Sequence, residues 1–201
     1  MQIMGKIKVR GIMEWSKIAL PVKKACLIIN GVEFGKNLMI RGRLKIYNQG
    51  KIMLGNNVTI NSADWANPVG GWNHTLLQVG GGGGTLLIGD GVGISNSAIT
   101  CWEHVEIGNN VLIGSGVRIY DTDFHPLESS YRYGEKKDGS RTIHDPVYIE
   151  DGVFIGAGSI ILKGVRIGKN SIVGAGSVVA KSIPEGEIWA GNPAKRVRES
   201  Q

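Results

Sequence analysis

Aliphatic residues recur at every sixth position through the second half of the chain. A small or β-branched residue follows each of them four positions later. A period of six does not match an α-helix, and it is too regular for hairpins joined by variable turns. It predicts a parallel β-helix, in which each six-residue unit forms one side of a coil and its aliphatic residue points into a continuous core. The aliphatic positions are Ile149, Ile155, Ile161, Ile167, Val173 and Val179, and the second positions are Val153, Ser159, Val165, Ser171, Ser177 and Ile183.

The same pattern runs earlier in the chain, with one extra residue between Thr100 and Ile107. Residues 124–146 are too polar to continue it, so we predict that they leave the scaffold as a loop. Weaker repeats at Leu54 and Ile60 place the first coils near residue 41, before an insertion at 61–84 that contains a run of glycines. The earlier aliphatic positions are Ile88, Ile94, Thr100, Ile107, Ile113 and Ile119, and the second positions are Val92, Ala98, Val111 and Val117.

We therefore expect one all-β domain over residues 41–190, preceded by a basic segment at 1–40 and followed by a tail at 191–201. The net charge of +6 is concentrated at the two ends of the chain. Neither end interleaves aromatic residues with the basic ones or carries a nucleic-acid-binding module, so nucleic acid is not an expected partner. The N-terminal lysines could touch an anionic membrane, but solvation explains them more simply.

Two cysteines without metal-ligand spacing favour a reducing cytoplasm, and the short N-terminal apolar runs are broken by lysines, which excludes a spanning helix. The 31 glycines indicate many turns or close backbone approaches.

Four segments carry a resemblance to the hexapeptide-repeat acyltransferases, and more narrowly to the sugar O-acetyltransferases that include the maltose and galactoside enzymes. These segments are residues 121–127 (DTDFHPL), 146–158, 174–181 and 190–195. The resemblance covers about residues 85–199. It implies a left-handed coil, a homotrimer, and acetyl-CoA bound between neighbouring subunits. Residues 1–40 do not resemble the helical segment with which the maltose and galactoside enzymes help bind their sugar, so the acceptor stays open.

The resemblance assigns His125 as the general base, in a His-Pro-Leu context. A hydroxyl is a poor nucleophile until its proton is removed, and histidine is suited to remove it near neutral pH. Asp123 and Asp121 are the nearest carboxylates, and either could orient the imidazole or bind an acceptor hydroxyl, although a main-chain carbonyl could orient it equally well. Asn96 lies near the family's substrate-contacting asparagine and is equally suited to a turn.

The resemblance also assigns residues that contact acetyl-CoA. Ala157, just beyond Gly156, is the candidate backbone N–H donor to the oxyanion of the tetrahedral intermediate. Phe154 flanks the pantetheine arm or packs at a coil corner. Phosphates favour backbone amides and cations. The residues expected near the pantetheine and the phosphates are Ala175, Ala180, Lys181, Lys195 and Arg198.

These expectations together predict an acetyl-CoA-dependent O-acetyltransferase that acts on a saccharide or a related hydroxylated small molecule and needs no metal. Within the same chemistry, an antibiotic or an amino sugar is an open acceptor. A metal-dependent hydratase of the γ-carbonic-anhydrase type shares the predicted fold and would use His104, His125 and His144, but its two closely spaced histidine ligands have no counterpart here. A non-catalytic scaffold for polysaccharide synthesis is the third hypothesis.

Overall fold

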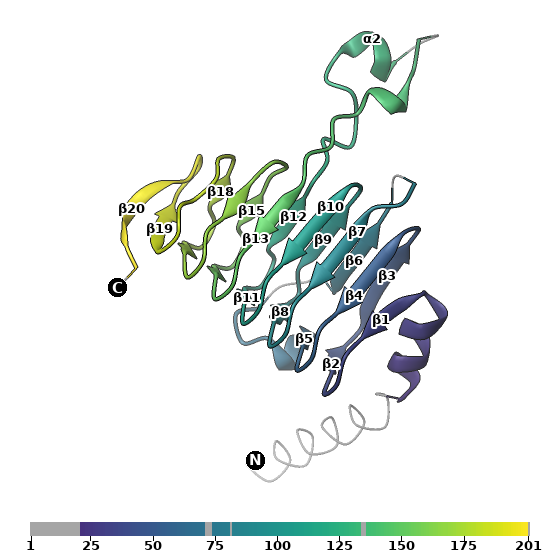
Figure 1. The fold of residues 1–201 in the computed structure, drawn as a ribbon, viewed down its shortest axis with the longest axis vertical. Helices are drawn as coiled ribbons and strands as arrows, with labels where there is room; N and C mark the ends of the chain where they lie inside the picture. The colour runs from purple at the N-terminus through teal and green to yellow at the C-terminus, as the bar shows by residue number, and fades with distance from the viewer. Residues whose placement is uncertain (1–20, 71–73, 81, 134–135, 201) are drawn as a thin grey trace, which may run out of the picture.

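The computed structural model describes residues 21–70, 74–80, 82–133 and 136–200. Its parallel strands stack into three sheets that form the sides of one β-helix (Figure 1). Sheet A contains β1 (Val32–Phe34), β4 (Lys51–Leu54), β7 (Thr85–Ile88), β10 (His104–Ile107), β13 (Val147–Ile149) and β16 (Arg166–Ile167). Sheet B contains β2 (Met39–Gly42), β5 (Thr59–Ser62), β8 (Gly93–Ser95), β11 (Leu112–Ile113), β14 (Phe154–Ile155), β17 (Ile172–Val173), β19 (Glu187–Ala190) and β20 (Lys195–Glu199). Sheet C contains β3 (Leu44–Asn48), β6 (Thr75–Val79), β9 (Ala98–Cys101), β12 (Arg118–Tyr120), β15 (Ile160–Ile161) and β18 (Val178–Val179).

The core confirms the six-residue pattern of the second half of the chain. Every aliphatic position from Ile149 to Val179 and every second position from Val153 to Ile183 is buried. The serines at three second positions are satisfied inside the coil; Ser171 Oγ, for example, donates to the Pro184 carbonyl at 2.6 Å. Each coil leaves sheet A, turns at the AB corner, crosses sheet B, turns at the BC corner, crosses sheet C and returns at the CA corner.

The coil that contains Asn96 departs from the predicted pattern. Ile99, not Ala98 or Thr100, pairs with Ile119 and fills the core, and Ala98 faces outward beside Arg118. The BC corner between Ile94 and Ile99 is one residue shorter than the corner between Ile113 and Ile119, so the whole strand shifts by one position. A shift of one residue in a strand exchanges its two faces. The prediction that Ala98 occupies a second, inward site was therefore wrong.

The coils extend beyond the predicted boundaries. Strands β1 and β2 begin before residue 41, and residues 21–29 form a helix whose Leu27 is buried at the open end of the first coil. Strand β6 lies inside the predicted insertion at 61–84, leaving a short 3₁₀ helix, η1 (Asp64–Ala66), outside the sheets. Strand β20 forms in the predicted tail and pairs antiparallel with β19. Residues 1–20 of the basic segment lie outside the described residues.

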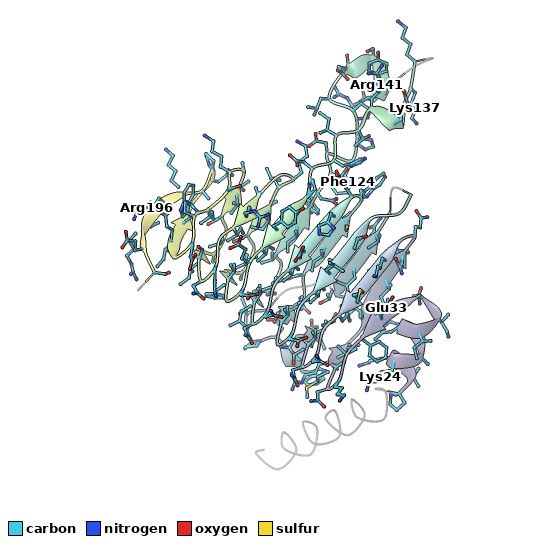
Figure 2. The ribbon with its side chains drawn as sticks, viewed as in Figure 1. Lys24, Glu33, Phe124, Lys137, Arg141 and Arg196 are labelled. Atoms are coloured by element: carbon cyan, nitrogen blue, oxygen red, sulfur yellow. The ribbon has the colours of Figure 1, made fainter. Side chains whose placement is uncertain are left out.

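The predicted loop is an arm that projects away from the stack of coils (Figure 1). It leaves after β12 and returns to β13, and it holds one short helix, α2 (Ser129–Arg132), and one 3₁₀ helix, η2 (Gly139–Arg141). In Figure 2, Phe124 lies where the arm leaves the coils and Arg141 and Lys137 lie toward its far end.

The two cysteines are expected to differ sharply in reactivity. Burial, and then the charge of Asp121, raises the pKa of the Cys101 thiol to about 12, whereas Cys26 is exposed. The thiolate is the reactive form, so Cys101 stays unreactive at neutral pH. A thiol-specific reagent should modify Cys26 alone in the native protein and both cysteines after unfolding. Rapid modification of Cys101 in the native protein would contradict this environment.

Candidate functional site

His125 lies at the CA corner, five residues after the end of strand β12, on the first turn of the arm. Its side chain is exposed, and no hydrogen bond joins it to another described residue. The preceding residue, Phe124, adopts a left-handed backbone with φ +62° and packs edge-on against Tyr120 with 5.1 Å between ring centroids. Burial raises the pKa of Tyr120, so its phenol keeps its proton beside this turn. The imidazole is thus presented outward from a defined turn.

Asp121 closes the coil beneath the arm. The carboxylate accepts hydrogen bonds from the backbone amides of Trp102, Glu103 and His104 at 2.8–2.9 Å, and the residue is fully buried. These three amides belong to the turn where the coil carries its extra residue. The observed contacts of Asp121 are therefore structural and none of them reaches His125.

His144 fastens the two ends of the arm together. Its Nδ1 lies 2.8 Å from Thr122 Oγ1, and the same hydroxyl accepts the Phe124 amide at 3.0 Å. Thr122 and His144 form an isolated antiparallel bridge, and the His144 ring stacks on Trp102 at 5.4 Å. These contacts fix the turn that precedes His125.

Replacing His144 by alanine should loosen that turn without unfolding the coils. The Thr122 hydroxyl loses a partner, and the hydrogen bond it accepts from Phe124 becomes easier to break. Native-state hydrogen exchange should show faster exchange at the amides of Asp123 and Phe124. His144→Asn is the matched control, because its amide nitrogen can replace Nδ1 and should restore slow exchange. Equal exchange in all three proteins would contradict this role for His144.

Asp123 is tied to the next coil rather than to the imidazole. Its Oδ2 lies 3.4 Å from Lys163 Nζ, and both side chains are about one quarter exposed. The angle at this ion pair is too poor for a hydrogen bond, so the buried Oδ2 atom has no hydrogen-bond partner. Asp123 is the carboxylate nearest to His125 along the chain that retains a free acceptor.

The BC corner differs from the AB corner in how its backbone amides are satisfied. At the AB corner, the amides of Asn56, Asp90 and Asn109 each donate to the side-chain Oδ1 of the next coil, at 2.6–2.8 Å. At the BC corner the equivalent residues include Ala157 and Ala175, whose methyl groups accept nothing. Among the described residues no acceptor meets their N–H groups. The sequence therefore builds a row of free backbone donors at one edge.

The same row tolerates no larger side chain at Gly156. A Cβ on this residue would lie 2.5 Å from the Ala175 nitrogen. Phe154, which precedes the row on β14, is 45% exposed and stands between Leu112 and Ile172 on the outer face of sheet B. The predicted set Phe154, Gly156, Ala157 and Ala175 is therefore brought together along the BC corner.

The basic residues predicted to meet phosphates lie in two places. Lys195 and Arg198 are exposed on β20, and no ion pair engages them among the described residues. Their neighbour Arg196 is instead paired with Glu187 at 2.7 Å and Glu199 at 3.2 Å; Figure 2 shows it at the C-terminal end of the stack. Ala180 and Lys181 follow β18 at the CA corner, on the same edge as His125.

Sheet C separates the two groups of predicted residues. Asn96, Ala157 and Ala175 precede its strands at the BC corner, whereas His125, Ala180 and Lys181 follow its strands at the CA corner. A strand of four residues spans roughly 13 Å. One chain therefore carries the predicted base and the predicted oxyanion donor on opposite edges of one sheet.

Asn96 occupies the BC corner in a left-handed conformation with φ +40°, where later coils have Gly116, Gly158 and Gly176. It is 2% exposed, and neither its side-chain nitrogen nor its side-chain oxygen has a hydrogen-bond partner. Both interpretations of Asn96, as a turn residue and as a polar contact, are compatible with this geometry.

Within the described residues, no group of three or more His, Cys, Asp or Glu side chains is placed to hold a metal ion. His104 instead lies on the outer face of sheet A, 3.3 Å from Glu106 and beside the Tyr148 ring. Across the described part of the chain, no helix is both long and apolar enough to cross a membrane.

Comparison with known proteins identifies the repeat. The family model for the bacterial transferase hexapeptide (six repeats) matches residues 146–181. The galactoside O-acetyltransferase of Lactococcus lactis is 42% identical over 114 residues, which is 56% of this chain and 52% of that protein. A tetrahydropyridine-dicarboxylate N-acetyltransferase of Staphylococcus aureus is 44% identical over 55 residues, 27% of this chain and 23% of that protein. The chain thus spans about half the length of the galactoside enzyme.

Solved structures show the same architecture over nearly the whole chain. AntD, an N-acyltransferase from Bacillus cereus solved with dTDP and coenzyme A, superposes with a TM-score of 0.69 at 26% identity and 89% coverage of both chains. A hexapeptide-repeat acetyltransferase from Vibrio cholerae, complexed with acetyl coenzyme A, superposes at 0.55 with 23% identity, covering 96% of this chain and 84% of that one. The left-handed parallel β-helix and the resemblance to hexapeptide-repeat acyltransferases are confirmed.

Sequence reasoning missed Trp102, Thr122 and Lys163, and it gave His144 no role. All of them act through contacts between segments that lie far apart in the sequence. The one available signal was the extra residue between Thr100 and Ile107, which marked an irregular turn that needed a buried partner.

Proposed function

We propose that the protein is an acetyl-CoA-dependent O-acetyltransferase that transfers an acetyl group to a hydroxyl of a saccharide. The observation that carries the proposal is the row of free amides at the BC corner, formed by residues 156–157 and 174–175. Gly156 and Ala157 lie within the segment that matches the hexapeptide transferase model. Preorganised backbone donors of this kind stabilise a developing oxyanion without reorganising.

The proposed reaction follows from the roles of two groups. His125 removes the proton of the acceptor hydroxyl as the oxygen attacks the thioester carbon. The carbonyl oxygen becomes an oxyanion and accepts the Ala157 N–H. The C–S bond then breaks, the carbonyl re-forms as an ester, and the imidazolium returns its proton to the departing CoA thiolate. Asp123, with its free Oδ2 atom, is the carboxylate we assign to orient the imidazole or bind the acceptor.

The cofactor contacts are proposed along the BC corner and β20. Phe154 offers an exposed ring to the pantetheine arm, and Ala175 offers the next free amide. Lys195 and Arg198 are free of ion pairs and suit the phosphates of the nucleotide. Ala180 and Lys181 lie on the opposite edge of sheet C and would reach a cofactor bound to a neighbouring copy.

This division of residues supports a homotrimer. A complete site requires the BC edge of one copy to face the CA edge of another, which is a heterologous contact. Such contacts close into a ring when the rotation permits, and a three-sided coil suits a ring of three. Light scattering of the purified chain should give the mass of three chains. A monomeric protein with full activity would contradict the shared site.

A thiol-release assay tests the function directly. Purified protein with acetyl-CoA should release CoA when neutral hexoses, anionic hexose derivatives or amino sugars are supplied, and mass spectrometry should locate the acetyl group on oxygen. The relatives include an O-acetyltransferase and N-acyltransferases. Acetyl transfer only to amino sugars would retain acyl transfer and reject the hydroxyl acceptor. Absence of CoA release with every acceptor, together with no binding of CoA, would overturn the proposal.

A further inference from the structure

A cavity of about 230 Å³ lies beside Asn96 on the outer face of sheet C. Strands β3, β6, β9 and β12 align Lys45, Leu76, Ala98 and Arg118 side by side across this face. The methyl group of Ala98 fills little space, so the face is hollow there. The hollow exists because the short corner at Asn96 turned Ala98 outward.

The lining of this cavity is basic. It includes Lys45, Arg118 and His74, and it includes no carboxylate. Neither Lys45 nor Arg118 takes part in an ion pair with any described residue, unlike Arg166 and Arg196, which are paired with glutamates at 2.9 and 2.7 Å. His74 Nδ1 faces the Ser62 carbonyl at 3.2 Å, so this nitrogen carries the proton and Nε2 remains an acceptor in the neutral ring. Two free cations at one hollow attract an anion.

Asn96 adds a neutral polar group to the same lining. Its amide nitrogen and oxygen are both buried without a partner. A buried polar group that lacks a partner costs roughly 1–3 kcal/mol, so such groups are satisfied when a ligand supplies the missing bonds. A sugar hydroxyl can donate to the amide oxygen and accept from the amide nitrogen. An anionic group alone could satisfy only the nitrogen.

We infer that this cavity binds the acceptor and that the acceptor is an anionic saccharide, in which a hydroxylated ring carries a phosphoryl or carboxylate group. Asn96 holds a ring hydroxyl, and Lys45 and Arg118 hold the anion. The inference rests on the proposed acetyltransferase activity, and it makes Lys45 and Arg118 residues that determine acceptor specificity.

The experiment compares matched acceptors that differ in charge. The full-length protein is assayed with acetyl-CoA and a hexose, the corresponding hexose 1-phosphate, a hexuronate and the methyl ester of that hexuronate. The wild type should show a kcat/KM at least about tenfold higher for a charged acceptor than for its neutral counterpart, and this preference should shrink as salt is added. The phosphate and carboxylate arms identify which anion is preferred.

Two variants assign the preference to this cavity. The double variant Lys45→Gln with Arg118→Gln should lose most of the preference for the charged acceptor and retain activity on neutral sugars within about twofold. The double variant Lys51→Gln with Lys169→Gln removes the same charge near sheet A and should leave the preference unchanged. Equal loss in both double variants, or a wild type that favours neutral acceptors, overturns the inference.

Calorimetry separates this inference from the proposed function. Binding of hexose 1-phosphate to the protein, measured with and without CoA, needs no turnover. Acetylation of neutral sugars with no measurable hexose 1-phosphate binding would reject the inference alone. Binding of hexose 1-phosphate that disappears in the Lys45→Gln, Arg118→Gln protein, without acetyl transfer to any acceptor, would support the cavity and reject the acetyltransferase. Asn96→Gly, which keeps the left-handed turn, should weaken the binding of charged and neutral acceptors alike.

Discussion

Replacing His125 by alanine is expected to lower the rate of acetyl transfer by roughly 10²–10⁴-fold, the usual contribution of a general base. The hydroxyl then attacks with its proton in place, so the loss appears in kcat and in kcat/KM. His125 is exposed and makes no hydrogen bond to another described residue, so its removal should not change the unfolding temperature. Calorimetric titration with CoA should give nearly the wild-type affinity, because the proposed cofactor contacts lie at the BC corner and β20.

His104→Ala is the matched control for this prediction. It removes an imidazole from the outer face of sheet A, where the ring meets Glu106 and Tyr148, and it leaves the proposed site untouched. The control should retain wild-type turnover. A His125→Ala protein that keeps turnover within about tenfold of wild type would exclude His125 as the base. Activity lost together with CoA affinity would point to a binding role instead.

The repeat made the core predictable, because each inward position depends on a short stretch of its own strand. From Ile149 to Ile183 every predicted inward residue is buried. The pattern failed at Ala98, where one corner is a residue shorter. A period read from the sequence shows that a register changes but not at which corner. Strand β6 was missed within the predicted insertion at 61–84, because its buried Leu77 and Val79 do not continue the repeat spacing.

The site was predictable only as far as the resemblance supplied residue roles. Spacing placed His125 beside a loop, and the structure shows the loop leaving at the CA corner. Spacing could not show that Ala157 and Ala175 have free amides, because this depends on the absence of an acceptor in the next coil. It also could not assign Asp121. The residue lies two positions from Asp123, yet one carboxylate is enclosed by backbone amides and the other faces Lys163.

Asp121→Ala is therefore expected to destabilise the fold rather than alter acceptor recognition. It leaves the amides of Trp102, Glu103 and His104 buried without their acceptor, and each such loss costs roughly 1–3 kcal/mol. We expect a loss of at least about 3 kcal/mol, which corresponds to a fall of about 6–12 °C in the unfolding midpoint for a chain of this size. Asp121→Asn should recover part of this stability through its one remaining acceptor oxygen.

Asp64→Ala provides the control, because Asp64 is exposed on η1 and its side chain makes no hydrogen bond within the described residues. It should change stability by less than about 0.5 kcal/mol. Differential scanning calorimetry of the three variants and the wild type measures the shifts. The opposite result is equally specific: an Asp121→Ala protein that unfolds at the wild-type temperature but loses acetyl transfer would place this carboxylate in the site. A stable, active Asp121→Ala protein would show that the three amides find other acceptors.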